Sequence, residues 1–182
     1  MADAMVSAGA KSGRPGSDEH APYFGKYISL VGGEDVVTTL EEQRRETLML
    51  LSSLSEDDGD SRYAPGKWSV KEVLGHVNDT ERIMSYRALR IARGDQTPLP
   101  GFEQDDYVKN AAHGRMSVDD LLEEYIAVRR GTLALFRHFD DAAWRRVGVA
   151  SENPTSARAL AFIIAGHELH HRRILEDKYF KR

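Results

Sequence analysis

The chain has 182 residues, of which 41% are hydrophobic and 30% charged, a composition typical of a single globular domain. It contains no cysteine, which excludes disulfides, thiolate metal ligands and a cysteine nucleophile. The net charge of −4 argues against a nucleic-acid partner, and no apolar run approaches the roughly 18–20 residues needed to span a membrane.

The first 21 residues are rich in glycine, alanine and serine and show no hydrophobic periodicity. This composition predicts a flexible tail in front of one domain formed by residues 22–182. The same stretch lacks the apolar core of a signal peptide, so we expect a cytoplasmic location.

Four later stretches repeat apolar residues with the period of an amphipathic helix. They predict helices over residues 34–54, 69–93, 117–139 and 155–178. Ser69 and Ser117 each precede an acidic residue by three positions, which is the pattern of a capping box at a helix start. The acidic stretch 55–60 is predicted to be a solvated loop, because it lacks the ligand spacing of a calcium-binding loop.

A long irregular connection, residues 95–116, separates the second and third predicted helices and contains a short helical turn around residues 104–110. Such a length suits two consecutive parallel helices, which require a crossover along the bundle. We find no convincing strand. The sequence therefore predicts an all-α fold, a four-helix bundle in up-down-down-up order with a long crossover between helices 2 and 3.

Two histidines lie four residues apart in the last predicted helix. His167 and His171 therefore project from one helix face, and apolar neighbours such as Ile163 and Ile174 place that face in the core. A buried imidazole without a partner is costly, so the pair favours a metal. One such pair arises by chance in roughly a quarter of chains with seven histidines, and the hypothesis needs a third ligand.

The remaining histidines are weaker candidates. His76, in the second predicted helix, is by its neighbours alone more typical of an ordinary histidine at the core edge. His113 and His138 are predicted to be polar surface residues. His170 is adjacent to His171 on the helix and is expected to pack or to face solvent.

Two segments resemble the DinB-like superfamily of metal-binding four-helix bundles, which includes YfiT-like and bacillithiol S-transferase-like proteins. They are Trp68-Ser-Val-Lys-Glu-Val-Leu-Gly-His76 and Gly166-His-Glu-Leu-His-His171, with further likeness in residues 98–105 and 158–160. The resemblance covers residues 22–180. It implies that His76, His167 and His171 bind a divalent metal. Members of the family transfer small thiols or isomerise substrates, and many have no assigned activity.

Three neutral imidazoles suit zinc or nickel first, and iron, cobalt or manganese next. Three protein ligands leave positions open for water or substrate, which is a catalytic arrangement. Because the chain lacks cysteine, thiol chemistry would need an external low-molecular-weight thiol. Residues 167–171 also match His-Glu-x-x-His of zinc proteases, but the chain ends eleven residues later and has no downstream third ligand of that class.

Glu168 and Arg129 are the candidate catalytic residues. Glu168 lies about 100° around the helix from His167, which favours a supporting or solvated role. Arg129 lies on the inner side of the third predicted helix, where a salt bridge is favoured over binding an anionic substrate group.

Together with the three-histidine pattern, the resemblance implies a metal-dependent enzyme of the thiol S-transferase or hydrolase type that acts on a small molecule. The alternative is a non-catalytic module in which a metal ties two helices together. The resemblance further implies a homodimer, because exposed apolar helix faces in the family often form dimers.

Overall fold

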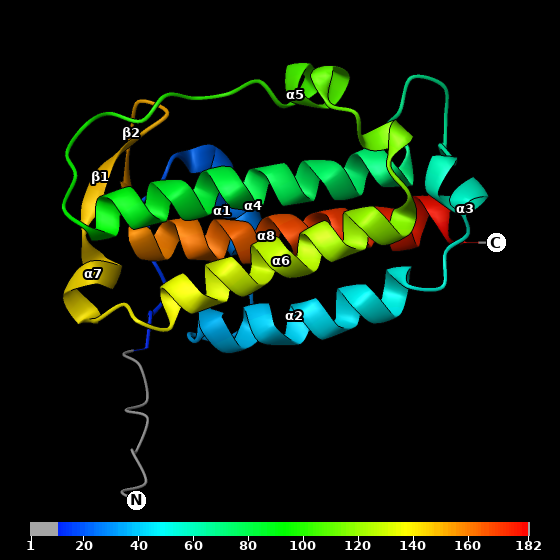
Figure 1. The fold of residues 1–182 in the computed structure, drawn as a ribbon. Coiled ribbons are helices and arrows are strands. Elements are labelled where there is room, and N and C mark those ends of the chain that lie inside the picture. Colours follow the sequence, from blue (N-terminus) through cyan, green and yellow to red (C-terminus); the bar gives the residue numbers. More distant parts are fainter. Residues whose placement is uncertain (1–10, 182) are drawn as a thin grey trace, which may run out of the picture.

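The protein is seen in a computed structural model that describes residues 11–181 (Figure 1). Its frame consists of four long helices, α2 (Val36–Leu51), α4 (Val70–Ala92), α6 (Val118–Phe136) and α8 (Ala157–Ile174). A short π-helical turn, η3 (Leu175–Tyr179), continues α8. Helices α2 and α8 run one way and α4 and α6 run the other way, which confirms the predicted up-down-down-up bundle.

Serine side chains begin several of these helices. Ser69 and Ser117 form the predicted capping boxes of α4 and α6. Ser55 forms a third capping box, with Asp58, and begins α3 (Glu56–Asp60). The prediction of a loop at residues 55–60 was therefore wrong, because the cap and the acidic first turn stabilise a short helix. Lys71 of α4 holds this helix through ion pairs of 2.6 Å with Glu56 and 2.9 Å with Asp60.

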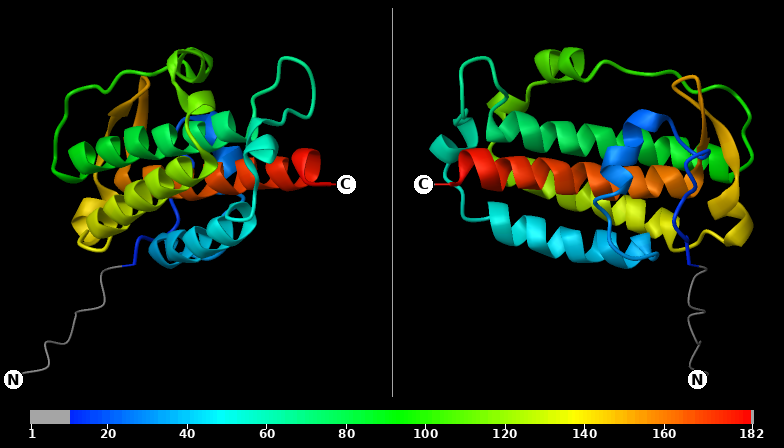
Figure 2. Two further views of the ribbon diagram at one scale, coloured as in Figure 1. Left: turned by 45° about the vertical axis from the view of Figure 1, so that its right-hand side comes forward. Right: turned by 180° about the vertical axis from the view of Figure 1, so that it is seen from behind.

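The crossover between α4 and α6 runs back along the outside of α4 (Figures 1 and 2). It contains α5 (Gln104–Asn110), as predicted, and a 3-10 turn, η2 (His113–Arg115). Its beginning is fixed by backbone hydrogen bonds of 2.9 Å from the Leu99 amide to the Val149 carbonyl and from the Ser151 amide to the Leu99 carbonyl. The crossover is therefore attached at the end of the bundle.

The segment between α6 and α8 differs from the prediction. After α7 (Asp141–Arg145) it forms an antiparallel hairpin of β1 (Val147–Ala150) and β2 (Asn153–Ser156). Its two turn residues, Ser151 and Glu152, have positive φ angles of 49° and 66°. Two-residue hairpin turns usually contain Asn-Gly or a similar pair, which predicts them from the sequence. The signal is absent here, so the expectation of no strand was wrong at this point.

The N-terminal segment also departs from the expected tail boundary. Residues 1–10 lie outside the described part of the chain. Ser12 is buried, Arg14 donates a hydrogen bond of 3.0 Å to the Ile28 carbonyl, and Glu19 forms an ion pair with Arg158 of α8. Residues 11–21 are thus packed on the domain. Hydrogen bonds and an ion pair hold them there, and a search for apolar periodicity does not detect such contacts. They lead into η1 (Pro22–Phe24) and α1 (Gly25–Ile28).

The bundle core has two apolar ends and a polar middle. One apolar cluster centres on residues such as Phe136, Trp144 and Phe162, and the other on Leu74, Leu121 and Tyr125. Between them each long helix contributes buried polar side chains, which we call the polar layer: Gln43, Thr47, His76, Glu81, Arg129, His167 and Glu168. No helix in the described residues is long and apolar enough to cross a membrane.

Candidate metal centre

Three histidines meet on the side of the polar layer between α4 and α8. The Nε2 atom of His167 lies 3.0 Å from Nε2 of His76 and 3.1 Å from Nε2 of His171. His76 and His167 are buried, and His171 is partly buried. The structure thus brings together the pair His167 and His171 and the third histidine, His76, that the family resemblance implied. This is the one cluster of its kind among the described residues.

Gly166 allows α1 to approach α8 beside this cluster. A Cβ atom at Gly166 would lie 2.0 Å from the Tyr27 carbonyl oxygen, so any larger residue would push α1 away. The close approach places the Tyr27 ring edge-on to His167, with 5.4 Å between ring centroids. His170 packs on Tyr27 as well, at 5.3 Å, and its ring belongs to this packing and not to the cluster.

Burial keeps the imidazoles neutral. It lowers the pKa of His76 to about 4 and that of His171 to about 3, and neighbouring imidazoles add to the effect. The pKa of His167 lies well below its ordinary value for the same reasons. None of the three rings contacts a carboxylate in the described residues. At neutral pH their nitrogen lone pairs are therefore available to a cation.

The distances from Nε2 of His167 to the other two imidazole nitrogens fit a single transition metal. Two ligands about 2.1 Å from one ion lie about 3.0 Å apart at right angles and about 3.4 Å apart in a tetrahedron. The observed 3.0 and 3.1 Å are within small side-chain adjustments of both geometries. The donor set of three imidazoles suits zinc, nickel, cobalt or iron and does not suit magnesium or calcium.

A cavity of about 690 Å³ opens on His76 and His167. Its other lining residues come from η1, α1, α4, α8, the crossover and the turn of the hairpin, and include Tyr27, Thr80, Met84, Arg87, Phe102 and Ile163. A second cavity, of about 360 Å³, reaches His171 from the side of Trp68 and Tyr179. Asp105 of α5 lines both. The crossover therefore forms a wall of the space in front of the histidines.

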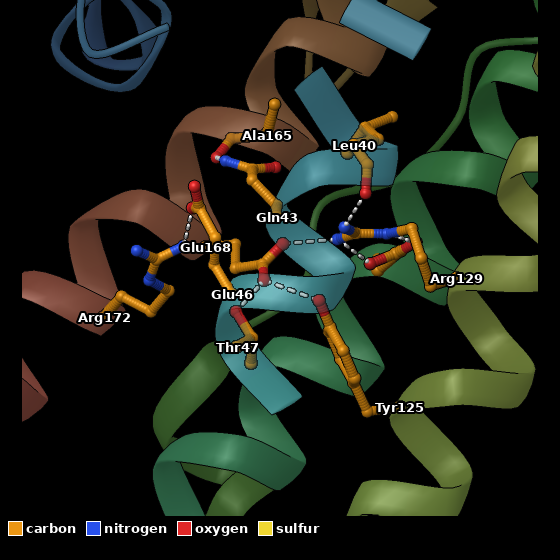
Figure 3. A network of polar contacts seen from close by, with 10 residues as sticks. Leu40, Gln43, Glu46, Thr47, Tyr125, Arg129, Ala165, Glu168 and Arg172 are labelled. Carbon is orange, nitrogen blue, oxygen red and sulfur yellow. Dashed lines mark hydrogen bonds and ion pairs between the residues drawn. The ribbon is translucent and has the colours of Figure 1, made fainter. Parts of the chain in front are cut away.

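Glu168 of α8 and Arg129 of α6 belong to a network of buried polar contacts, which we call the closed network (Figure 3). Arg129 donates to Glu81 at 2.7 and 2.8 Å and to Glu168 at 2.5 Å. Glu168 also accepts hydrogen bonds from Thr47 at 2.5 Å and Tyr125 at 2.6 Å. The salt bridge predicted for Arg129 is confirmed. Neither of the two candidate catalytic residues lines the cavity.

Several members of the closed network and of the cavity wall were not predicted from the sequence. In the sequence, the residues Glu81, Thr47 and Tyr125 are typical of ordinary helix positions. The one signal for Glu81 was Arg129 on the inner side of another helix, because a buried arginine needs a carboxylate partner. Thr80 and Arg87 line the cavity at helical spacing from His76, and that spacing could have indicated them.

Two other histidines were predicted to be surface residues. His138 is exposed, as expected. The prediction was wrong for His113, which is buried. Its ring fills the gap left by Gly75 of α4, where a Cβ atom would come within 2.3 Å of it, and its Nε2 atom lies 3.6 Å from Asp79. The missing side chain at Gly75 creates that niche, and only the packing of the crossover reveals it.

The fold and the histidine cluster together define a four-helix-bundle protein with a candidate metal site. The chain belongs to the DinB superfamily, whose family model matches residues 39–175. A segment of 58 residues is 28% identical to "Putative metal-dependent hydrolase OB0413" of Oceanobacillus iheyensis, and this match covers 31% of the chain and about a third (33%) of that relative.

Among solved structures, the chain is similar to YfiT from Bacillus subtilis, described as a probable metal-dependent hydrolase with an unusual four-helix bundle topology. The TM-score is 0.70 with 16% sequence identity, over 90% of this chain and 89% of that one. At this identity the likeness shows the fold.

Proposed function

We propose that His76, His167 and His171 bind one divalent transition metal, zinc or nickel first, and that the protein is a metal-dependent hydrolase of a small molecule. The observation that supports this most is the convergence of three neutral imidazoles from two helices at the wall of a cavity of about 690 Å³. A structural metal would be closed by a fourth protein ligand. None is present at the cluster among the described residues.

The residues of the site would have different roles, in metal binding and in enclosing a substrate. A metal bound here would supply a Lewis acid that lowers the pKa of bound water to about 7. His76, His167 and His171 would fix its position, and Tyr27 packs on His167 and limits the movement of that ring. Met84, Phe102 and Ile163 give the cavity apolar walls, which exclude bulk water around a bound substrate.

A thiol S-transferase is the second candidate. Two cavities reach the histidines, one at His76 and His167 and the other at His171. Two approaches would let two substrates reach the histidines separately, and an external low-molecular-weight thiol would have to be one of them, because the chain has no cysteine. The non-catalytic alternative is a metal that ties α4 to α8. The predicted homodimer and cytoplasmic location stay predictions.

Elemental analysis of protein purified without added metal is the first test, and we expect one equivalent of a transition metal per chain. Metal-loaded and EDTA-stripped protein should then be screened against ester, amide and phosphoester substrates, and separately against thiol and electrophile pairs. Hydrolysis that requires the metal supports the first candidate, and metal-dependent thiol transfer supports the second. Metal without activity in either screen would favour the structural alternative. Absence of metal and of metal binding would overturn the site.

A further inference from the structure

Arg87 of α4 is a buried cation that faces the cavity. Its side chain is 3% exposed, and it lines the same space as His76 and His167. Residues 76, 80, 84 and 87 follow one another at helical spacing and line one face of α4. Because helical side chains lean toward the N-terminus, the guanidinium leans along this face toward His76.

The guanidinium has incomplete partners. It donates to the Pro100 carbonyl, lies 3.6 Å from the Met84 sulfur, and stands 5.7 Å from the Phe102 ring centroid. No carboxylate lies within ion-pair distance of it in the described residues. The other two buried lysine or arginine residues in the described part of the chain, Lys71 and Arg129, each have two carboxylate partners. Burial accordingly lowers the pKa of Arg87.

A buried cation without a counter-charge lowers stability unless something else compensates it. Pro100 and Met84 each accept one N–H of the guanidinium. The remaining N–H donors are coplanar and can bind a carboxylate through two hydrogen bonds. Thr80 also lines this cavity, and its buried hydroxyl has no hydrogen-bond partner within the described protein. The site therefore lacks an anion and a hydrogen-bonding group that a ligand would supply.

We infer that Arg87 binds a carboxylate group of the small molecule that enters the cavity. The inference rests on the proposed function in one respect: the reacting part of that molecule lies at the histidines. His76 and Arg87 are eleven residues apart, about 16 Å along the helix axis, so the molecule is elongated. Its middle passes Met84 and Ile163 and is therefore apolar.

The charge of the cavity rim selects between anions. Glu103, Asp105 and Asp106 of the crossover also line the cavity, and all three are exposed. Their negative potential disfavours a doubly charged phosphate more than a singly charged carboxylate, although solvent weakens the effect. A monocarboxylate with an apolar chain fits these features best.

Octanoate is a suitable probe, and octan-1-ol is the uncharged molecule of matched length. Binding of each is measured by calorimetry to wild type, Arg87→Met and Arg90→Met, with the metal content of every sample recorded. Arg90 is the matched control, because it lies one turn further along α4 and pairs with Asp95. We expect Arg87→Met to bind octanoate at least tenfold more weakly, Arg90→Met to match wild type, and octan-1-ol to bind all three equally.

Several results would overturn the inference. They are unchanged octanoate binding in Arg87→Met, no octanoate binding to wild type at millimolar concentration, or tighter binding of inorganic phosphate that Arg87→Met abolishes. A carboxylate bound to the metal instead would be lost after EDTA treatment and kept in Arg87→Met, and this too would overturn the inference. Failure of the proposed function is seen separately, in the metal content.

A purely structural role for Arg87 makes a different prediction. If the residue served only to hold Pro100, Arg87→Met would lower the melting temperature and weaken octanoate and octan-1-ol binding to the same degree. We expect the melting temperature of the ligand-free variant to stay equal or to rise, because methionine removes an uncompensated buried charge.

Discussion

The bundle interior contains two buried arginines in different environments, one on each side. Arg129 of α6 is 0% exposed and lies between Glu81 and Glu168, whereas Arg87 of α4 has no carboxylate within ion-pair distance in the described residues. Burial alone would lower the pKa of both. The two carboxylates outweigh burial and raise the pKa of Arg129 well above its ordinary value, and the pKa of Arg87 falls. A charge with all its partners inside the protein supports the fold, and a charge left without one points to a ligand.

The same division runs along α8. Glu168 is held by Arg129, Thr47 and Tyr125 in the closed network, while His167 and His171 turn toward the cavities. Adjacent positions in one helix thus belong to two environments. Changes in the closed network should lower stability, and changes among the histidines should remove metal and leave a folded bundle. The predictions below test this difference.

The largest effect is expected for Arg129→Met, which leaves two carboxylates buried without their cation. Breaking a buried ion pair in this way costs about 3–5 kcal/mol of unfolding free energy. Urea denaturation followed by circular dichroism measures it. Arg130→Met, one residue along and exposed, is the matched control and should change stability by less than about 0.5 kcal/mol. Equal midpoints for the two variants would contradict the division drawn here.

The next largest effect concerns metal affinity. His171→Ala, His167→Ala and His76→Ala should each weaken metal binding by at least about tenfold to a hundredfold, since even the loss of a group that supports a ligand costs that much. His170→Ala, which removes a ring that packs on Tyr27, should keep one metal per chain. Competition with a chelating dye measures the affinities. Equal losses for His170→Ala and His171→Ala would show that the ligand pair is wrongly assigned.

Acid should affect the metal-free protein in a defined range. The ordinary histidine pKa of 6.5 is lowered in the folded protein to about 4 for His76 and about 3 for His171. Between pH 6.5 and pH 3 the unfolded chain therefore binds more protons than the folded chain. The free energy of unfolding falls as the pH drops through this range. Thermal melts across this range should show a shallower fall for His171→Ala. A melting temperature independent of pH from 6.5 to 4 would argue against burial of the neutral imidazoles.

The smallest effect tests the N-terminal segment. Burial opposes ionisation of Glu19, but Arg158 and the Gly16 amide outweigh it and lower its pKa to about 2. Replacing this carboxylate, in Glu19→Gln, should cost about 1 kcal/mol at neutral pH. Deleting residues 1–21 should lower the melting temperature more than deleting residues 1–10. Identical melting temperatures for the two truncations would show that residues 11–21 do not stabilise the domain and behave as the flexible tail that the sequence predicted.

Much of the fold was predictable because helix signals are local. Apolar spacing and the serine caps of α4 and α6 act over a few residues, so helix positions came within a few residues of those observed. The hairpin was missed because Ser151 and Glu152 adopt positive φ without the usual turn residues. The niche of His113 was missed because it depends on a glycine, Gly75, that is remote in sequence.

The sequence by itself determined the four helices, their order in the bundle and the shared face of His167 and His171. Tertiary structure decided which buried charges have partners. The ion pair of Arg129 with Glu81 joins residues 48 positions apart, and the cavity beside Arg87 is walled by a crossover whose path no local pattern describes. Periodicity and capping arise within a turn or two of helix, whereas pairing and cavities depend on how whole helices pack, and for that reason only the folded chain distinguishes one buried arginine from the other.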